Sequence, residues 1–245
     1  MATISLEIDD YWTEYCELES QFRDIIRYVA LIRRHKDVIS LKLANLSSHI
    51  GNWMESVFYR MARTERYQRY LPEYPITGIK DFIDNPCVDN FRKTFEPYYE
   101  LSEQRVRVLP HDYGVVKPFE EFSQLVNPEW FKAYSKYKHN REELFNQMTL
   151  AHVTNSLAGL FILNVFPWEM REYALKKGII YSKWGESKTY DTGAAVTETL
   201  LSHPHTLRGR YLSFVGGIMA ETSIFRFEFR RWKSENDQTL RPSEL

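Results

Sequence analysis

Residues 150–168 read LAHVTNSLAGLFILNVFPW and form the most apolar run of the chain. Between residues 157 and 163 apolar side chains would cover nearly every side of a helix, which is typical of a helix buried in the middle of a bundle. The helical pattern extends from Arg141 to about Lys176, and Pro167 is expected to end or kink the helix. The run is shorter than the roughly 20 apolar residues that a membrane-spanning helix needs. We therefore expect a central helix and no membrane partner.

Two regular helical patterns lie before this run. Residues 9–34 repeat apolar side chains at alternating spacings of four and three, namely Tyr11, Tyr15, Leu18, Phe22, Ile25, Val29 and Ile32. Residues 39–61 repeat the same spacing, with Ser40 as the expected N-cap. Because only a few residues separate the two segments, they are expected to form an antiparallel hairpin. The second helix also has a polar face, on which most side chains are expected to be solvated: Asn45, His49, Asn52, Glu55 and Ser56.

The chain changes character after Gly178. Residues 179–181 and 224–231 are rich in strand-forming side chains, and the second segment alternates, with Phe225, Phe227 and Phe229 on one side. Shorter elements are expected elsewhere: helices over 78–93, 118–125 and 191–202, a strand over 105–108 and a turn over 111–114. The sequence thus predicts a mainly α protein, an antiparallel helical bundle built on a long helical hairpin. The expected domains are a helical bundle at residues 1–177 and a small C-terminal α+β extension at residues 178–245.

The composition limits the location and the partners. Lys+Arg 32 against Asp+Glu 33 leaves a formal net charge of -1, so no global field would attract nucleic acid or an acidic membrane. The only two cysteines are Cys16 and Cys87, and Cys16 lies in a helical pattern, where we interpret it as a small hydrophobe. Few cysteines and an acidic, base-free start predict a soluble protein of the reducing cytoplasm.

Several kinds of chemistry have no sequence support. The chain contains no Gly-rich phosphate loop, no His-Glu-x-x-His and no paired Cys-x-x-Cys, so we expect no cofactor and no metal. His203 and His205 offer two ligands around a proline without an obvious third, which favours an ordinary loop.

One cluster of side chains does suggest chemistry, and it lies at residues 130–141, WFKAYSKYKHNR. On a helix Lys132, Lys136 and His139 would share one face, with Lys138 and Arg141 beside it. A histidine can exchange a proton near neutral pH and a cation can stabilise a phosphate, which together is what metal-independent RNA cleavage needs. A second interpretation stays open, in which the cations pair with nearby glutamates, His139 is a local cap and the aromatic side chains, including Tyr134, pack against the bundle.

A second basic stretch follows the predicted hairpin. Arg60, Arg63, Arg66 and Arg69 recur every three residues among tyrosines. Either this stripe is a solvated helix end, whose dipole favours cations, or it binds an anion such as RNA.

The order of these parts resembles the HEPN superfamily of small helical proteins from prokaryotic defence, toxin-antitoxin and RNA-processing systems. The resemblance rests on the hairpin at residues 9–66 and on a basic motif with a histidine that opens a final long helix at residues 139–166. The resemblance implies a homodimer that binds RNA. The candidate RNA-binding residues come from the two basic stretches themselves: Lys136, Lys138, Arg141, Tyr134, Arg60, Arg63 and Arg66. In the ribonucleases of the superfamily an arginine precedes the histidine by a short spacing; here the histidine is His139, and Lys132 is the only basic side chain at the arginine positions.

The leading hypothesis is therefore a HEPN-like RNA-binding protein and candidate metal-independent endoribonuclease, with His139 and Lys132 as the candidate catalytic pair. The alternative is a non-enzymatic interaction or scaffold subunit that docks a protein partner on the hairpin and on the C-terminal strand.

Overall fold

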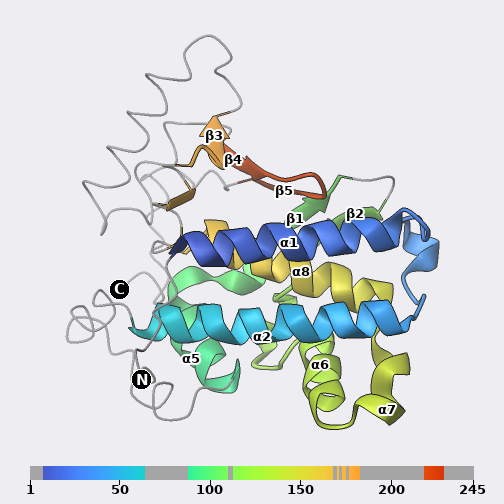
Figure 1. Cartoon of the computed structure of the whole chain (residues 1–245). Helices are drawn as coiled ribbons and strands as arrows, with labels where there is room; N and C mark the ends of the chain where they lie inside the picture. Colours follow the sequence, from blue (N-terminus) through green and yellow to red (C-terminus); the bar gives the residue numbers. More distant parts are fainter. Residues whose placement is uncertain are drawn as a thin grey trace, which may run out of the picture.

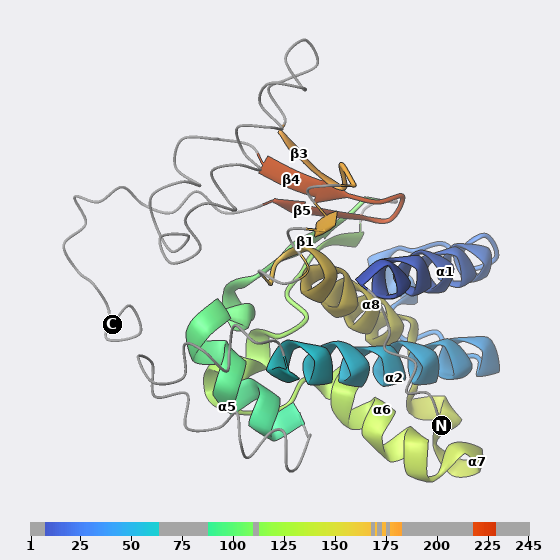
Figure 2. The ribbon, with the colours of Figure 1, turned by 60° about the vertical axis from the view of Figure 1, so that its left-hand side comes forward.

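The computed structural model describes residues 8–63, 88–109, 113–167, 170, 173–174, 177–182 and 218–228. Within these residues the protein is mainly helical, with a small antiparallel sheet on one side. Figures 1 and 2 show the sheet next to α1 and α8, while α6 and α7 lie on the other side of the molecule, beyond α2.

The central helix is α8 (Leu150–Val165), and nearly all of its side chains are buried. It packs against α1 (Ile8–Ile26), α2 (Leu41–Arg63) and α6 (Glu129–His139), which confirms the prediction of a helix in the middle of a bundle. The helix ends at Val165, two residues before Pro167, because a residue that precedes proline is disfavoured in helical conformation.

Helices α1 and α2 run antiparallel and form the predicted hairpin (Figure 1). The Ser40 hydroxyl accepts a hydrogen bond from the Leu43 N–H at 3.1 Å, which confirms the predicted N-cap of α2.

The expected extension of the first helix to residue 34 is wrong, because α1 ends at Ile26 and a loop with the short 3-10 helix η1 (Arg33–His35) follows. Two carbonyls of this loop accept hydrogen bonds from the first turn of α8: Leu150 N–H to Val38 O at 2.8 Å and Ala151 N–H to Lys36 O at 2.9 Å. The loop thereby satisfies donors that a helix start leaves unpaired.

The segment between α6 and α8 also differs from the prediction of one continuous helix from Arg141. Asn140, with φ −144° and ψ 78°, separates α6 from the short α7 (Arg141–Leu144), and the 3-10 helix η5 (Phe145–Gln147) follows. Helix α8 then starts afresh with Thr149 as N-cap, whose side chain accepts from the His152 N–H at 3.2 Å. His139 therefore closes α6 and does not open the central helix.

The remaining described segments cover the sides of the bundle. Helix α5 (Val88–Tyr99) is followed by the 3-10 helix η2 (Leu101–Glu103), and the expected helix over 118–125 is the 3-10 helix η4 (Glu120–Gln124). The expected helix over 191–202 and residues 78–87 of the expected helix over 78–93 lie outside the described residues.

The sheet has the strand order β2-β1-β5-β4-β3, with all neighbours antiparallel. Its strands are β1 (Val106–Val108), β2 (Gly114–Val116), β3 (Ile180–Ser182), β4 (Ile218–Glu221) and β5 (Phe225–Glu228). The strands expected near 105–108, 179–181 and 224–231 are confirmed, although the last is shorter, while β2 and β4 were not predicted. Strand β1 comes from the expected bundle domain at residues 1–177, and β5 comes from the expected C-terminal extension at residues 178–245. Because β1 pairs with β5, hydrogen bonds within one sheet join these two parts of the chain.

The sheet packs on α8 through the phenylalanines of β5. The Phe225 ring stacks on Phe161 with centroids 6.1 Å apart, and Phe227 meets Phe166 edge to face at 5.6 Å. The side chains of Phe225 and Phe227 are both buried, as the alternation of the sequence predicts. Phe229 lies outside the described residues.

A buried carboxylate ties the sheet to α1. Glu19 Oε1 accepts hydrogen bonds from the Thr222 hydroxyl and from the Ile224 N–H, both at the turn between β4 and β5. Burial raises the pKa of the Glu19 carboxyl, although these hydrogen bonds act in the opposite direction. One turn away, Cys16 is exposed, so its interpretation as a packed hydrophobe is wrong.

Candidate functional site

Helix α6 carries the basic cluster of the sequence and presents its aromatic side to the bundle. Trp130, Phe131, Tyr134 and Tyr137 are buried, and the Trp130 indole donates a hydrogen bond to the Pro118 carbonyl at 2.6 Å. Tyr134 is only 1% exposed, so its ring has no face open to a base. The aromatic side chains therefore pack, as the second interpretation of the sequence held, and they hold the cations of α6 at the surface.

A layer of polar contacts joins α6 to α2. The Tyr137 hydroxyl donates to Asn45 Oδ1 at 3.2 Å, and the Tyr134 hydroxyl lies 2.9 Å from Asn52 Oδ1 and 3.3 Å from Glu55 Oε1. Burial is the first cause that raises the pKa of Tyr134 well above its usual range, and the charge of Glu55 is the second. The tyrosine hydroxyl therefore stays protonated and acts as a hydrogen-bond donor.

The sequence did not predict this contact layer, although the expectation that most of the polar face of α2 is solvated holds, since Asn45, His49 and Asn52 are exposed. Asn45, Asn52 and Glu55 follow one another at seven and three positions, a spacing that aligns them on one face of a helix. Paired with the tyrosines of 130–141, that spacing was the available signal for two helices in polar contact.

The cation Lys138 belongs to the same layer. Its ammonium group lies 2.9 Å from Glu55 Oε2 and 5.7 Å from the centroid of the Tyr134 ring. Both partners of the ion pair are about 40% exposed, at 41% and 43%, so the pair is at the surface and contributes little to stability. Lys138 is thus already paired with an acid.

The candidate catalytic pair His139 and Lys132 is not brought together within one protomer. Lys132 donates to Glu129 at 2.6 Å, in the direction of the start of α6, and seven residues, or about 10.5 Å of helix, separate it from His139. The hydrogen bond from Lys132 lowers the pKa of the Glu129 carboxyl, and the charges of His152 and Lys136 act in the same direction. Lys132 is therefore held by an acid at the opposite end of the helix.

Three basic side chains of this region differ from the paired lysines Lys132 and Lys138. Lys136, His139 and Arg141 are exposed, and among the residues that the structure describes none of them forms an ion pair. Lys136 and His139 lie in the last turn of α6, while Arg141 begins α7 after Asn140. We refer to Lys136, His139 and Arg141 as the basic end of α6.

The arginine stripe lies elsewhere on the protein. The Arg60 guanidinium lies 5.2 Å from the centroid of the Tyr11 ring, at the far end of α2. Since Tyr137 contacts Asn45, the basic end of α6 lies about 22 Å from Arg60 along α2, counted over fifteen residues. Arg63 is the last residue of α2, and Arg66 lies outside the described residues. The structure does not bring Arg60 and the basic end of α6 into one site.

In the described part of the chain, no group of three or more His, Cys, Asp or Glu side chains is placed to hold a metal ion, and no helix combines the length and apolarity for crossing a membrane. His203 and His205 lie outside that part.

Comparisons with known proteins give no family for this chain: no protein-family model, no curated protein and no solved structure matches it.

Proposed function

We propose that this protein binds single-stranded RNA through phosphate contacts at the basic end of α6. The observation that supports the proposal is the exposure of Lys136, His139 and Arg141 at one place, without an ion pair among the described residues. Lysine and arginine side chains that have no acid partner are available to replace the counterions of a phosphate backbone. Because the neighbouring aromatic rings are buried, this binding would be electrostatic and nearly independent of base sequence.

The buried tyrosines give this surface a fixed position. Tyr134 and Tyr137 anchor α6 to α2 through the hydrogen bonds to Asn52 and Asn45, so the last turn of α6 is held against a rigid helix. A cation on a rigid helix is presented to a ligand at a lower entropic cost than one on a free loop.

Cleavage is a separate proposal, which the geometry of one protomer does not support. The predicted partner of His139 is not beside it, since Lys132 is bound to Glu129 at the other end of α6. A two-fold homodimer that places both His139 side chains in one cleft would supply the missing partner. This arrangement follows from the HEPN resemblance and gives the proposal its enzymatic form.

Binding is tested by fluorescence anisotropy with a labelled single-stranded RNA of mixed sequence. We expect the combined variant Lys136→Gln, His139→Gln and Arg141→Gln to bind at least about tenfold more weakly than the wild type at low salt. The control variant Lys93→Gln with Arg105→Gln removes the same two formal charges from exposed positions in α5 and just before β1, and should bind as the wild type does. Equal losses in both variants, or no binding by the wild type, would refute the proposal.

Cleavage is tested on the same RNA in the presence of EDTA, with His139→Ala as the comparison. Cleavage by the wild type that is lost in His139→Ala supports the enzymatic form. A wild type that binds the RNA but leaves it intact restricts the function to binding.

A second candidate function is a non-enzymatic subunit that pairs with a second copy through the loop end of the hairpin. Ile39 and Leu41, at the start of α2, are 43% and 61% exposed, and Phe145, in a segment that packs on α2, is 40% exposed. Exposed apolar side chains at one end of a molecule are typical of an interface. Sedimentation of the wild type and of Leu41→Ser tests it: a dimer that Leu41→Ser dissociates is expected, and a monomeric wild type excludes it.

A further inference from the structure

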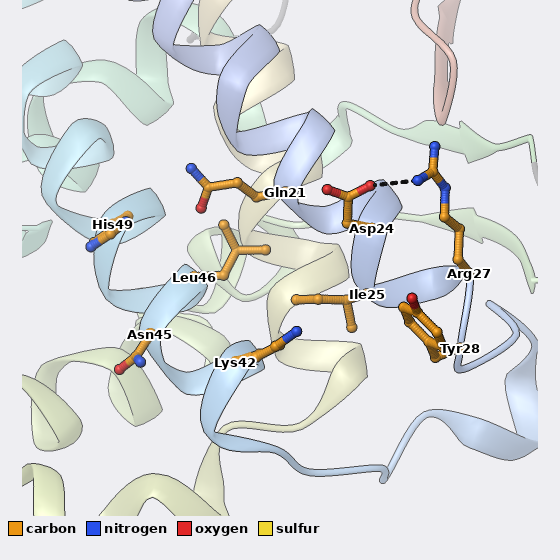
Figure 3. Close-up of a pocket in the computed structure, with 9 residues that line it drawn as sticks. All are labelled: Gln21, Asp24, Ile25, Arg27, Tyr28, Lys42, Asn45, Leu46 and His49. Carbon is orange, nitrogen blue, oxygen red and sulfur yellow. Dashed lines mark ion pairs between the residues drawn. The ribbon is translucent and has the colours of Figure 1, made fainter.

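The two helices of the hairpin enclose a groove on the surface of the protein. The groove has a volume of about 490 Å³ and is lined by the end of α1, by Arg27 and Tyr28 of the loop that follows, and by the first half of α2. Figure 3 shows Ile25 and Leu46 directed into the space between the helices, where they form an apolar floor. Tyr28 stands at the edge with 87% of its surface exposed, so its ring is free to be covered by a ligand.

The charges around the groove are unequal. Asp24 is already paired with Arg27 at 3.1 Å, and this ion pair is drawn in Figure 3. Lys42 extends from α2 towards the side of Ile25, and within the described part of the chain it forms no ion pair. His49 lies two turns further along the same helix. The groove thus combines an apolar floor, an exposed ring and one ammonium group that lacks an acid partner.

We propose that this groove binds a small organic carboxylate with an apolar body. The body would lie over Ile25 and Leu46 and against the Tyr28 ring, and the carboxylate would pair with the Lys42 ammonium group. Such an arrangement buries apolar surface and gives the Lys42 ammonium group, which forms no ion pair with the described residues, an acid partner.

The size of the groove supports a small molecule as the occupant. Sites for small ligands in proteins commonly measure about 300–1,000 Å³, and the volume of the groove lies within this range. Polar side chains make up most of the lining around Ile25, Leu46 and Tyr28, so the apolar contact is confined to these three residues. Seven residues separate Lys42 from His49, so the α2 side of the groove is about 10.5 Å long, which matches a body of two rings. The site is separate from the basic end of α6 and does not depend on RNA binding.

The test uses two probes of the same shape, 4-biphenylcarboxylate and the uncharged 4-biphenylcarboxamide. Binding is followed by the amide signals of the isotope-labelled full chain in two-dimensional NMR spectra. We expect saturable shifts at the groove residues and weaker binding of the carboxamide. Lys42→Gln should weaken the carboxylate by about two- to fivefold at low salt and leave the carboxamide unchanged. Tyr28→Ser should weaken both probes, because it removes the exposed ring that covers them.

The control is Lys93→Gln, an exposed lysine on α5, which should leave both probes unaffected. The proposal is overturned when 4-biphenylcarboxylate shifts no groove signal up to its solubility limit, or when Lys42→Gln weakens both probes equally. It is also overturned when Lys42→Gln weakens single-stranded RNA as much as the carboxylate, because the groove would then be part of an RNA surface. Loss of RNA binding in the variant at the basic end of α6 has no bearing on either probe, so the two proposals fail independently.

Discussion

The substitution Gly51→Ala tests how closely α6 packs against α2. A Cβ atom at residue 51 would lie 2.3 Å to 2.5 Å from three atoms of the Tyr134 ring, which is closer than carbon atoms can approach. The ring cannot move away cheaply, since it is buried and its hydroxyl is bound to Asn52 and Glu55. Overpacking of a core costs about 1–3 kcal/mol, and the rigid ring places this site at the upper end of the range. Alanine is a better helix former than glycine by about 1 kcal/mol. The net expectation is a loss of about 2 kcal/mol in the free energy of unfolding.

The measurement is unfolding in urea, followed by circular dichroism, with Gly159→Ala as the matched control. Gly159 also lies inside a helix, but its Cβ would meet Phe119 at 3.1 Å and the flexible Met54 at 3.3 Å. Gly159→Ala should therefore change the stability by well under the loss at Gly51. In a Tyr134→Leu background, Gly51→Ala should no longer destabilise. A Gly51→Ala variant as stable as the wild type, or equally destabilised in both backgrounds, would refute this packing of α6 on α2.

Three further substitutions test the contacts described above. Glu19→Gln should raise the free energy of unfolding at neutral pH. Burial raises the folded-state pKa of Glu19, so its contribution is fully present below the unfolded value and is lost as the pH rises through the folded value. The gap between Glu19→Gln and the wild type in urea unfolding should thus widen from pH 4 to pH 7, and a constant gap would contradict the assignment. Thr149→Ala removes the N-cap of α8 and should cost about 1 kcal/mol in the same assay; an unchanged midpoint would show that the cap is not needed. Lys138→Met breaks the exposed pair with Glu55 and should change stability by less than about 1 kcal/mol, with any loss disappearing at high salt; a larger or salt-independent loss would indicate a buried pair.

The helices could be predicted from the sequence where an apolar period is long and unambiguous. The central helix and the two helices of the hairpin follow from such periods, and the alternating phenylalanines of residues 225 and 227 predict a strand with its aromatic side chains on one side. In each case local pattern and burial agree, so no tertiary information is needed.

The element boundaries depended on contacts between distant segments. The apolar period continues past Ile26, but the loop that follows turns so that Val38 O and Lys36 O can accept from the first turn of α8. Strand β1 pairs with β5, whose residues lie 117 to 121 positions later in the chain, since Val108 pairs with Phe225 and Val106 with Phe227. No local spacing reveals such a register.

In the candidate site, too, local spacing predicts some features, while others depend on contacts between distant segments. Exposed basic side chains on a helix could be predicted, because Lys136 and His139 share a face at helical spacing. The ion pair of Lys138 with Glu55 and the burial of Tyr134 could not, since both depend on how α6 docks onto α2. The sequence could suggest which side chains carry charge, and only the fold shows which charges lack a partner.

The dependence of RNA affinity on salt tests the central claim, phosphate binding by the basic end of α6, most directly. The logarithm of the association constant should fall linearly with the logarithm of the salt concentration, with a slope of about −0.7 for each phosphate contact of a single strand. With two to three contacts at Lys136, His139 and Arg141, we predict a slope of about −1.4 to −2.1 for the wild type and a clearly smaller slope for Lys136→Gln with Arg141→Gln. An affinity that does not change with salt, or a slope that the two substitutions leave unaltered, would contradict the account.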